Sequence, residues 1–126
     1  MIPKYRAWHK TYDELGKVKR IRFDGEGNVT TVLFEGKFLG VDTHVDEIEL
    51  MQSTDMVDRD GKIIFEGDIV KMSKDVYSEP IYYEVVRHYG GAYRLESKQH
   101  GCELWLRHTD CEVVGNVYEN KELLDA

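Results

Sequence analysis

Closely spaced turn residues divide the second half of the chain into short β-type runs. The runs cover residues 68–72, 81–88, 92–96, 102–107 and 111–118, and the last four are separated by Gly90-Gly91, residues 97–101 and residues 108–110. Short strands leave open hydrogen-bonding edges unless their sheet closes on itself. The spacing therefore predicts a small antiparallel barrel of the SH3-like kind.

The first third of the chain predicts antiparallel strands. Residues 4–10 alternate as a short strand, and residues 17–23 and 29–34 form a hairpin around the Gly-rich turn 24–28. Strict alternation assigns the side chains of the first hairpin strand to two faces, Lys17, Lys19, Ile21 and Phe23 against Val18, Arg20 and Arg22. Residues 41–51 fit both helical and strand spacing, and we favour a strand from about Glu47.

Two turns interrupt the central run of residues 50–70. In the turn 58–61, the side chains of Asp58 and Asp60 are expected to accept hydrogen bonds from nearby amides, and Gly61 is expected to supply a positive φ. In the second turn, Gly67 stands between Glu66 and Asp68 and starts the strand that follows. Both turns have a backbone rationale, and neither pairs a nucleophile with a base.

Together these signals predict a mainly β protein with two lobes in one compact unit. Residues 1–60 form an N-terminal hairpin lobe, and residues 61–126 form the SH3-like barrel with a short C-terminal helical turn that Asn120 caps. Gly61, Gly67 and Gly115 are expected at turns or close backbone approaches. The predicted core consists of Trp8, Phe65, Ile69, Val70, Val85, Leu95, Leu104, Val114 and Val117.

Composition indicates an ordinary folded protein. Of the 126 residues, 41% are hydrophobic and 33% are charged. No apolar run approaches the ~20 residues of a membrane-spanning helix, and the first residues read as a strand rather than a leader, so we expect a cytoplasmic protein. The two cysteines, Cys102 and Cys111, are too few for the disulfide framework of a small secreted domain.

The charge is unevenly distributed. The net charge is −7, but residues 1–40 carry eight Lys and Arg against five Asp and Glu, whereas residues 41–126 carry nine against nineteen. An acidic surface disfavours sequence-independent binding of nucleic acid, which depends on Lys and Arg replacing counterions at the phosphates. A local basic site in the N-terminal part stays compatible with this distribution.

Three blocks of sequence carry a resemblance to a known family. They are Tyr5-Arg6-Ala7-Trp8, the central run that ends in Ile64-Phe65-Glu66-Gly67-Asp68-Ile69-Val70, and the run of residues 112–120 (Glu112-Val113-Val114-Gly115-Asn116-Val117-Tyr118-Glu119-Asn120) with Glu122-Leu123-Leu124 after it. In their order and spread, they make the chain resemble the YopX family, small proteins encoded by bacteriophages and prophages, mostly of low-GC Gram-positive hosts.

The resemblance implies a mostly β fold and a phage-borne origin. It supplies no catalytic residues, because the family has no assigned biochemical role. Two positions depart from the family pattern: Asp55 stands where Gly is usual, and Lys121 where Pro is common.

Metal and acid–base sites receive little support from the sequence. His100, Cys102, His108 and Cys111 are zinc-liganding types, but the predicted strand between the two pairs would separate them by ~17–20 Å. Aligning Gly61 with the invariant Gly of a calcium loop puts Met56 and Gly67 at ligand positions. Glu66 and Asp68 lie in a turn, where carboxylates normally bind amides or face water. We therefore predict no metal, no cofactor and no catalytic residue, hence a non-enzyme.

Two kinds of binding compete as explanations. Lys17, Lys19, Arg20 and Arg22 make a basic strand, and aromatic residues in the second half could supply stacking surfaces for single-stranded nucleic acid, namely Tyr82, Tyr83, Tyr89, Tyr93 and Trp105. The alternative is a protein interface, since open strand edges invite pairing with another copy. The favoured interpretation is a non-catalytic binding or assembly module that forms homo-oligomers or binds a host or phage protein. A small nucleic-acid-binding accessory protein is the alternative.

Overall fold

The computed structural model describes residues 4–35, 42–73, 75–88 and 91–125. By its internal contacts the chain divides into two compact units, Met1–Gln52 (unit 1) and Ser53–Ala126 (unit 2). No helix in the described ranges is long and apolar enough to cross a membrane.

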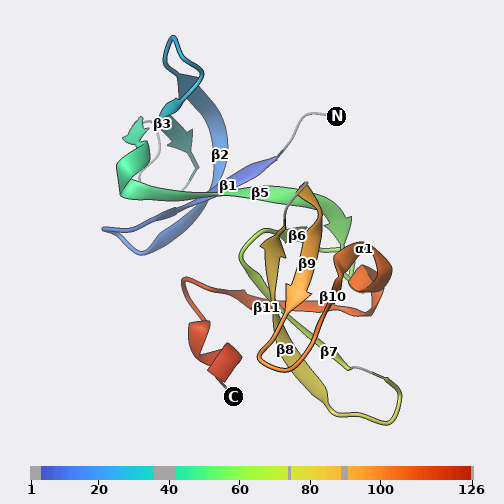
Figure 1. The fold of residues 1–126 in the computed structure, drawn as a ribbon. Helices are drawn as coiled ribbons and strands as arrows, with labels where there is room; N and C mark the ends of the chain where they lie inside the picture. The colour runs from blue at the N-terminus through green and yellow to red at the C-terminus, as the bar shows by residue number, and fades with distance from the viewer. Residues whose placement is uncertain (1–3, 36–41, 74, 89–90, 126) are drawn as a thin grey trace. The chain divides into compact units, whose positions relative to one another are not determined.

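Unit 1 is an antiparallel sheet built from hairpins (Figure 1). Its strands are β1 (Tyr5–His9), β2 (Glu14–Phe23), β3 (Val29–Phe34), β4 (Thr43–His44) and the first half of β5 (Ile48–Val57). They are ordered β4-β3-β2-β1-β5. The predicted β2–β3 hairpin and the strand from about residue 47 are confirmed. The ambiguous run 41–51 contains a short helical element, a 3₁₀ turn over Val45–Glu47, directly before the strand.

A β-bulge in β2 changes which of its side chains share a face. Val18 pairs with Phe34 and Arg20 pairs with Leu33, so Lys19 is an extra residue between them. Val18 and Ile21, three positions apart, both pack against the unit 1 core of Ala7, Val32, Phe34 and Ile48. The strict alternation predicted for this strand is therefore wrong, because it assumes that every residue has its own cross-strand partner.

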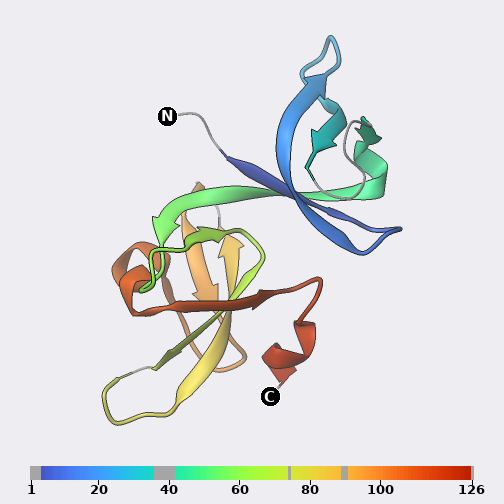
Figure 2. The ribbon, with the colours of Figure 1, turned by 180° about the vertical axis from the view of Figure 1, so that it is seen from behind.

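Unit 2 contains a five-stranded antiparallel sheet of order β10-β9-β8-β7-β11, seen from the back in Figure 2. The strands are β7 (Asp68–Ser73), β8 (Pro80–Arg87), β9 (Tyr93–Glu96), β10 (Gly101–Glu103) and β11 (Glu112–Asn116). A short strand, β6 (Ile63–Phe65), pairs with the second half of β5. The mainly β class is confirmed. The SH3-like barrel is not confirmed. In the described residues, β10 and β11 are the two end strands of this sheet and do not pair with each other, so the sheet does not close.

One predicted strand is partly a helix. The run 102–107 is β10 followed by the single helical turn α1 (Leu104–Arg107) and the 3₁₀ turn η3 (His108–Asp110). Burial decides the difference: Leu104 is fully buried in the core, whereas Trp105 and Leu106 are 63% and 58% exposed. A run of three apolar residues has no period that distinguishes helix from strand. The strand predicted over 111–118 is also shorter and ends at Asn116.

Burial confirms six of the nine predicted core residues and corrects the other three; the six are Trp8, Ile69, Val70, Val85, Leu95 and Leu104. The main core cluster of unit 2 consists of Ile64, Val70, Met72, Tyr83, Val85, Leu95, Leu104 and Cys111. Phe65, Val114 and Val117 are only half-buried, and Ile64 takes the place expected for Phe65. Val114 is displaced because it is the extra residue of a bulge in β11, where Val113 pairs with Val70 and Gly115 with Ile69.

Buried polar side chains hold the turns of unit 2. Asp58, Asp68 and Asn116 are at most 5% exposed, and each accepts backbone hydrogen bonds near a turn. The predicted turn glycines are confirmed, since Gly61 and Gly67 have φ of 82° and 85°. A C-terminal 3₁₀ turn, η4 (Lys121–Asp125), follows Asn120, whose carbonyl accepts a hydrogen bond from the Leu123 N–H at 3.0 Å.

Candidate functional site

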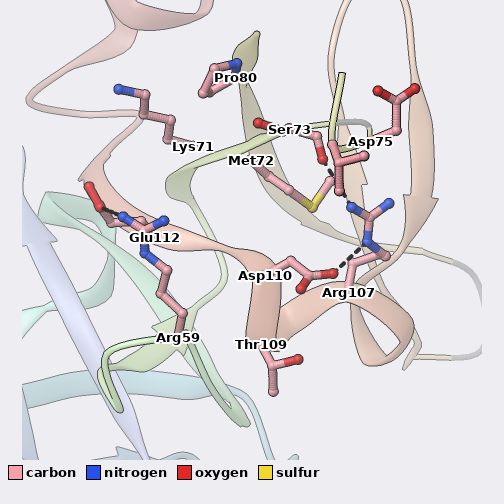
Figure 3. Close-up of a pocket in the computed structure, with 11 residues that line it drawn as sticks. Arg59, Lys71, Met72, Ser73, Asp75, Pro80, Arg107, Thr109, Asp110 and Glu112 are labelled. Atoms are coloured by element: carbon pink, nitrogen blue, oxygen red, sulfur yellow. Dashed lines mark hydrogen bonds and ion pairs between the residues drawn. The ribbon is translucent and has the colours of Figure 1, made fainter. Parts of the chain in front are cut away.

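A pocket of about 590 Å³ lies in unit 2, between the β7–β8 hairpin and the segment formed by α1 and η3 (Figure 3). The end of β7 contributes Lys71, Met72 and Ser73, and the hairpin contributes Asp75, Val76 and Pro80. Arg107 and Asp110 come from the opposite segment, and Arg59 and Glu112 complete the lining. Residues far apart in the sequence are thus brought to one concave surface.

Ion pairs neutralise much of the charge in the pocket. The Arg59 guanidinium contacts the Glu112 carboxylate, and Glu112 is also the cross-strand partner of Lys71. Figure 3 shows these three side chains together at one end of the pocket. Three cationic and three carboxylate side chains line the pocket, so the lining is balanced in charge.

Arg107 ties the two walls of the pocket together. Its Nε donates to Asp110 Oδ2 at 2.9 Å, and its Nη2 donates to the Ser73 backbone carbonyl at 3.0 Å. The first bond fixes the guanidinium within its own segment, and the second reaches across to the end of β7. The pocket shape therefore depends on one side chain that is held at both ends.

Large apolar side chains are exposed in the two segments that carry pocket residues. At the tip of the β7–β8 hairpin, Val76 is 90% and Tyr77 is 95% exposed, and on α1 Trp105 and Leu106 stand next to Arg107. We call these four residues the apolar flanks. Soluble proteins rarely expose neighbouring large apolar residues unless the surface contacts something.

The hairpin tip is an ordered turn. Asp75 Oδ1 accepts hydrogen bonds of 2.9 Å from the Tyr77 backbone N–H and from the Ser78 hydroxyl. This Asx-type turn sets the backbone from which Val76 and Tyr77 project. Of the four flank residues, only Trp105 was a candidate from the sequence. For Val76 and Tyr77, the available signal was an apolar pair directly after Asp75, in the interval between two predicted strands.

The four candidate zinc ligands do not form one cluster. His100 lies exposed in the β9–β10 turn, and His108 Nδ1 is 2.8 Å from the Val57 carbonyl oxygen. Cys111 is fully buried in the core, and Cys102 is half-buried. In the part of the chain that the structure describes, no three His, Cys, Asp or Glu side chains are grouped so that they could hold a metal ion.

The other carboxylate candidates serve the backbone or surface ion pairs. Asp68 Oδ2 accepts a 2.7 Å hydrogen bond from the Phe65 backbone N–H, which closes the turn before β7. Glu66 lies 3.8 Å from the Arg87 guanidinium in a partly exposed ion pair. The two carboxylates of this turn thus have different partners.

The predicted nucleic-acid candidates fall into different units. Lys17, Lys19, Arg20 and Arg22 are all exposed on β2 of unit 1. Of the aromatic residues proposed to accompany them, Tyr83 is 2% exposed and part of the unit 2 core, and Tyr82 and Tyr93 are half-buried on neighbouring strands. Tyr89 lies outside the described residues.

Comparison with known proteins decides the family. The sequence model of the YopX protein family matches residues 4–125. The chain belongs to the YopX family. No curated protein has a sequence that matches this YopX-family chain.

Two solved structures share the YopX-type fold over nearly the whole chain. Protein EF1440 from Enterococcus faecalis is 26% identical, with a TM-score of 0.72, over 98% of this chain and 99% of that one. Protein YopX from Bacillus subtilis is 22% identical, with a TM-score of 0.64, over 98% of this chain and 96% of that one. Two of the three blocks that carry the family resemblance contain Asp68 or Asn116, whose buried side chains hold turns, so these two blocks serve the fold.

Proposed function

We propose that this YopX-family chain is a non-catalytic module that binds another protein or assembles with further copies of itself. The observation that carries the proposal is the 58–95% exposure of the apolar flanks, which belong to the two segments that carry residues of the unit 2 pocket. Trp, Tyr and Arg are the residue types that dominate binding energy in protein interfaces, and these two segments carry one of each, Trp105, Tyr77 and Arg107.

The ordered state of this surface also supports a binding role. Asp75 fixes the hairpin tip, and Arg107 links the hairpin to the opposite wall. A surface that is already ordered loses little conformational entropy when a partner binds. The backbone that carries the apolar side chains is therefore already ordered before a partner binds.

The sheet edges are less suited to pairing with another copy than the sequence suggests. β4 and β10, which end their sheets, have only two and three residues. The turn 58–61 covers the start of the outer edge of β11, because the Val113 N–H donates to Asp58 Oδ2 and the Arg59 N–H donates to the Cys111 carbonyl just before the strand, both at 2.9 Å. Short and covered edges disfavour pairing with another strand. Homo-oligomerisation stays a prediction, and we place it on the apolar flanks instead of the strand edges.

The family resemblance supports a phage or prophage origin for this module and action in the cytoplasm of a bacterial host. The test is site-specific crosslinking in the native bacterium, with a photoreactive phenylalanine at position 77 or 105. Position 12 is the matched control, because Tyr12 is 57% exposed but lies in unit 1.

We expect covalent products from positions 77 and 105 and none from position 12. Mass spectrometry of the products then separates the two forms of the proposal, since a second copy means assembly and a different protein means binding. Absence of products from both unit 2 positions, or equal products from position 12, would contradict the proposal.

A further inference from the structure

We infer a second binding surface, on unit 1, for the phosphate backbone of single-stranded nucleic acid. The surface is formed by the side chains of Lys17, Lys19, Arg20 and Arg22, which we call the β2 cationic face. This face contains none of the residues of the pocket in unit 2, so it can be tested independently of the proposed protein interface.

The bulge in β2 is what gathers these cations. In a regular strand the two lysines and the two arginines would point to opposite faces. The extra residue between Val18 and Arg20 reverses the alternation, so Val18 and Ile21 pack inward. All four cationic residues are exposed on the side away from this core.

Three of the cations already hold carboxylate oxygens. Arg20 Nη2 lies 3.1 Å and 3.2 Å from the two carboxylate oxygens of Asp42, and Arg22 Nε lies 3.6 Å from the same group. Lys19 Nζ lies 3.6 Å from Glu35 Oε1. Two guanidinium groups on one anion is the arrangement that also recognises phosphate.

These ion pairs are weak enough to exchange. The side chains of Lys19, Arg20 and Arg22 are 49–58% exposed, and pairs of this kind contribute about 0–1 kcal/mol because water screens them. A phosphate can therefore replace Asp42 at little cost. Asp42 then acts as an internal competitor that occupies the two arginines when no ligand is bound.

An exposed aromatic ring favours single-stranded nucleic acid over an acidic protein. Phe23 is 59% exposed at the end of β2, where it pairs with Val29, so its ring lies beyond the cationic face and is available to a strand that runs along that face and past its end. Nonspecific single-strand binding combines cations along the backbone with aromatic rings on which bases stack. Side chains two residues apart on a strand repeat every ~6.6 Å, a spacing comparable with successive phosphates of an extended single strand.

The acidic charge of the rest of the protein determines the salt concentration at which binding should be measured. With a net charge of −7, long-range repulsion opposes a polyanion, so binding is expected at low salt and falls as salt is added. We would follow fluorescence anisotropy of a labelled oligothymidylate with the whole protein at several salt concentrations. Circular dichroism and thermal unfolding would show that each variant is folded.

The central comparison is between two double variants with the same charge change. Arg20→Gln with Arg22→Gln is expected to weaken binding about tenfold and to reduce the salt slope by about 1.4, which is ~0.7 for each lost phosphate contact. Lys62→Gln with Lys98→Gln removes two exposed cations from unit 2 and should change little. Asp42→Asn should strengthen binding, because it removes the internal competitor.

Phe23→Ser supplies an independent readout, since it should weaken binding without altering the salt slope. Failure of the unaltered protein to bind oligothymidylate at low salt would overturn the inference. Equal losses in the two double variants would also overturn it, because binding would then follow net charge alone. Displacement of the oligonucleotide by polyglutamate at equal charge concentration would point to an acidic protein as the ligand and reject nucleic acid.

Discussion

Asp58 and Val113 are joined by a hydrogen bond of 2.9 Å from the Val113 backbone N–H to Asp58 Oδ2, across 55 positions of sequence. The other carboxylate oxygen, Oδ1, accepts 2.9 Å hydrogen bonds from the N–H groups of Asp60 and Lys62. The side chain is only 3% exposed. One carboxylate thus closes the turn before β6 and attaches that turn to β11.

Removing the charge of Asp58 should destabilise unit 2. Asp58→Asn turns one acceptor oxygen into a donor amide, which cannot satisfy both the turn amides and the Val113 N–H. Because a buried N–H without an acceptor costs about 1–3 kcal/mol, we expect the free energy of unfolding at pH 7 to fall by about 2–4 kcal/mol in a urea titration. Asp60→Asn, at an exposed position of the same turn, should cost less than ~0.5 kcal/mol. A similar loss in both variants would refute the role of the buried carboxylate.

Asp58 should also make stability depend on pH. Burial by itself raises the pKa of this carboxyl, but hydrogen bonds from the Val113, Lys62 and Asp60 amides outweigh burial and hold the pKa below 3.8. Since the folded pKa is lower than the unfolded pKa, the stabilisation is present above pH ~4 and is lost as the pH falls through the folded pKa. The difference in unfolding free energy between wild type and Asp58→Asn should therefore shrink in acid. A difference that stays constant down to pH ~2 would contradict this.

Glu84 should show the opposite pH dependence. Burial raises its pKa above 4.5, and attraction from Lys121 lowers it by less. Because the folded pKa lies above the unfolded pKa, stability is lost as the pH rises through this interval, and the ionised carboxylate is disfavoured at pH 7. Glu84→Gln should therefore raise the Tm at pH 7, and the gain should vanish below pH ~4. The exposed Glu79→Gln serves as the control, and an equal shift in Tm there would count against this account.

Gly115 and Asn120 should be energetically coupled. A Cβ at Gly115 would lie 2.6 Å from Asn120 Cγ and 2.9 Å from Asn120 Cβ, while Asn120 Oδ1 accepts a hydrogen bond from the Asn116 N–H at 3.2 Å. Gly115→Ala should cost about 1–3 kcal/mol through this clash. Asn120→Gly removes the obstructing side chain, so the double variant should lose less than the sum of the single losses. Strictly additive losses in thermal unfolding would argue against the close approach.

The two thiols should differ in reactivity. Burial raises the pKa of Cys111 to about 12, and its Sγ lies 3.3 Å from the Arg107 carbonyl oxygen and 3.9 Å from Met72 Sδ. Burial also raises the pKa of Cys102, but that residue is partly exposed. Thiolates are the reactive species, so iodoacetamide at pH 8 should label Cys102 before Cys111, and urea should remove the difference. Faster labelling of Cys111 in the folded protein would show that the core around it opens.

The local signals of the chain were sufficient for its turns and most of its strands. Asp58 and Gly61 shape their turn through their own side chain and φ, and alternating β-branched residues define β3. These features depend on neighbours within a few residues, which a sequence displays directly. The same logic explains why the family blocks were recognisable, since Asp68 and Asn116 satisfy backbone groups close to them in the chain.

Tertiary structure alone decided the features on which both binding proposals depend. The bulges at Lys19 and Val114 arise from the register between two strands, and each moves side chains to another face without any change in composition. In the run that becomes a helical turn, Leu104 is fully buried in the core and Trp105 is 63% exposed, a difference that the sequence of apolar residues does not display. Across the pocket, Arg107 donates a hydrogen bond to the Ser73 carbonyl, 34 positions away in the sequence. Sequence determines local backbone preferences, whereas strand register, burial and long-range hydrogen bonds are settled only when distant segments pack together.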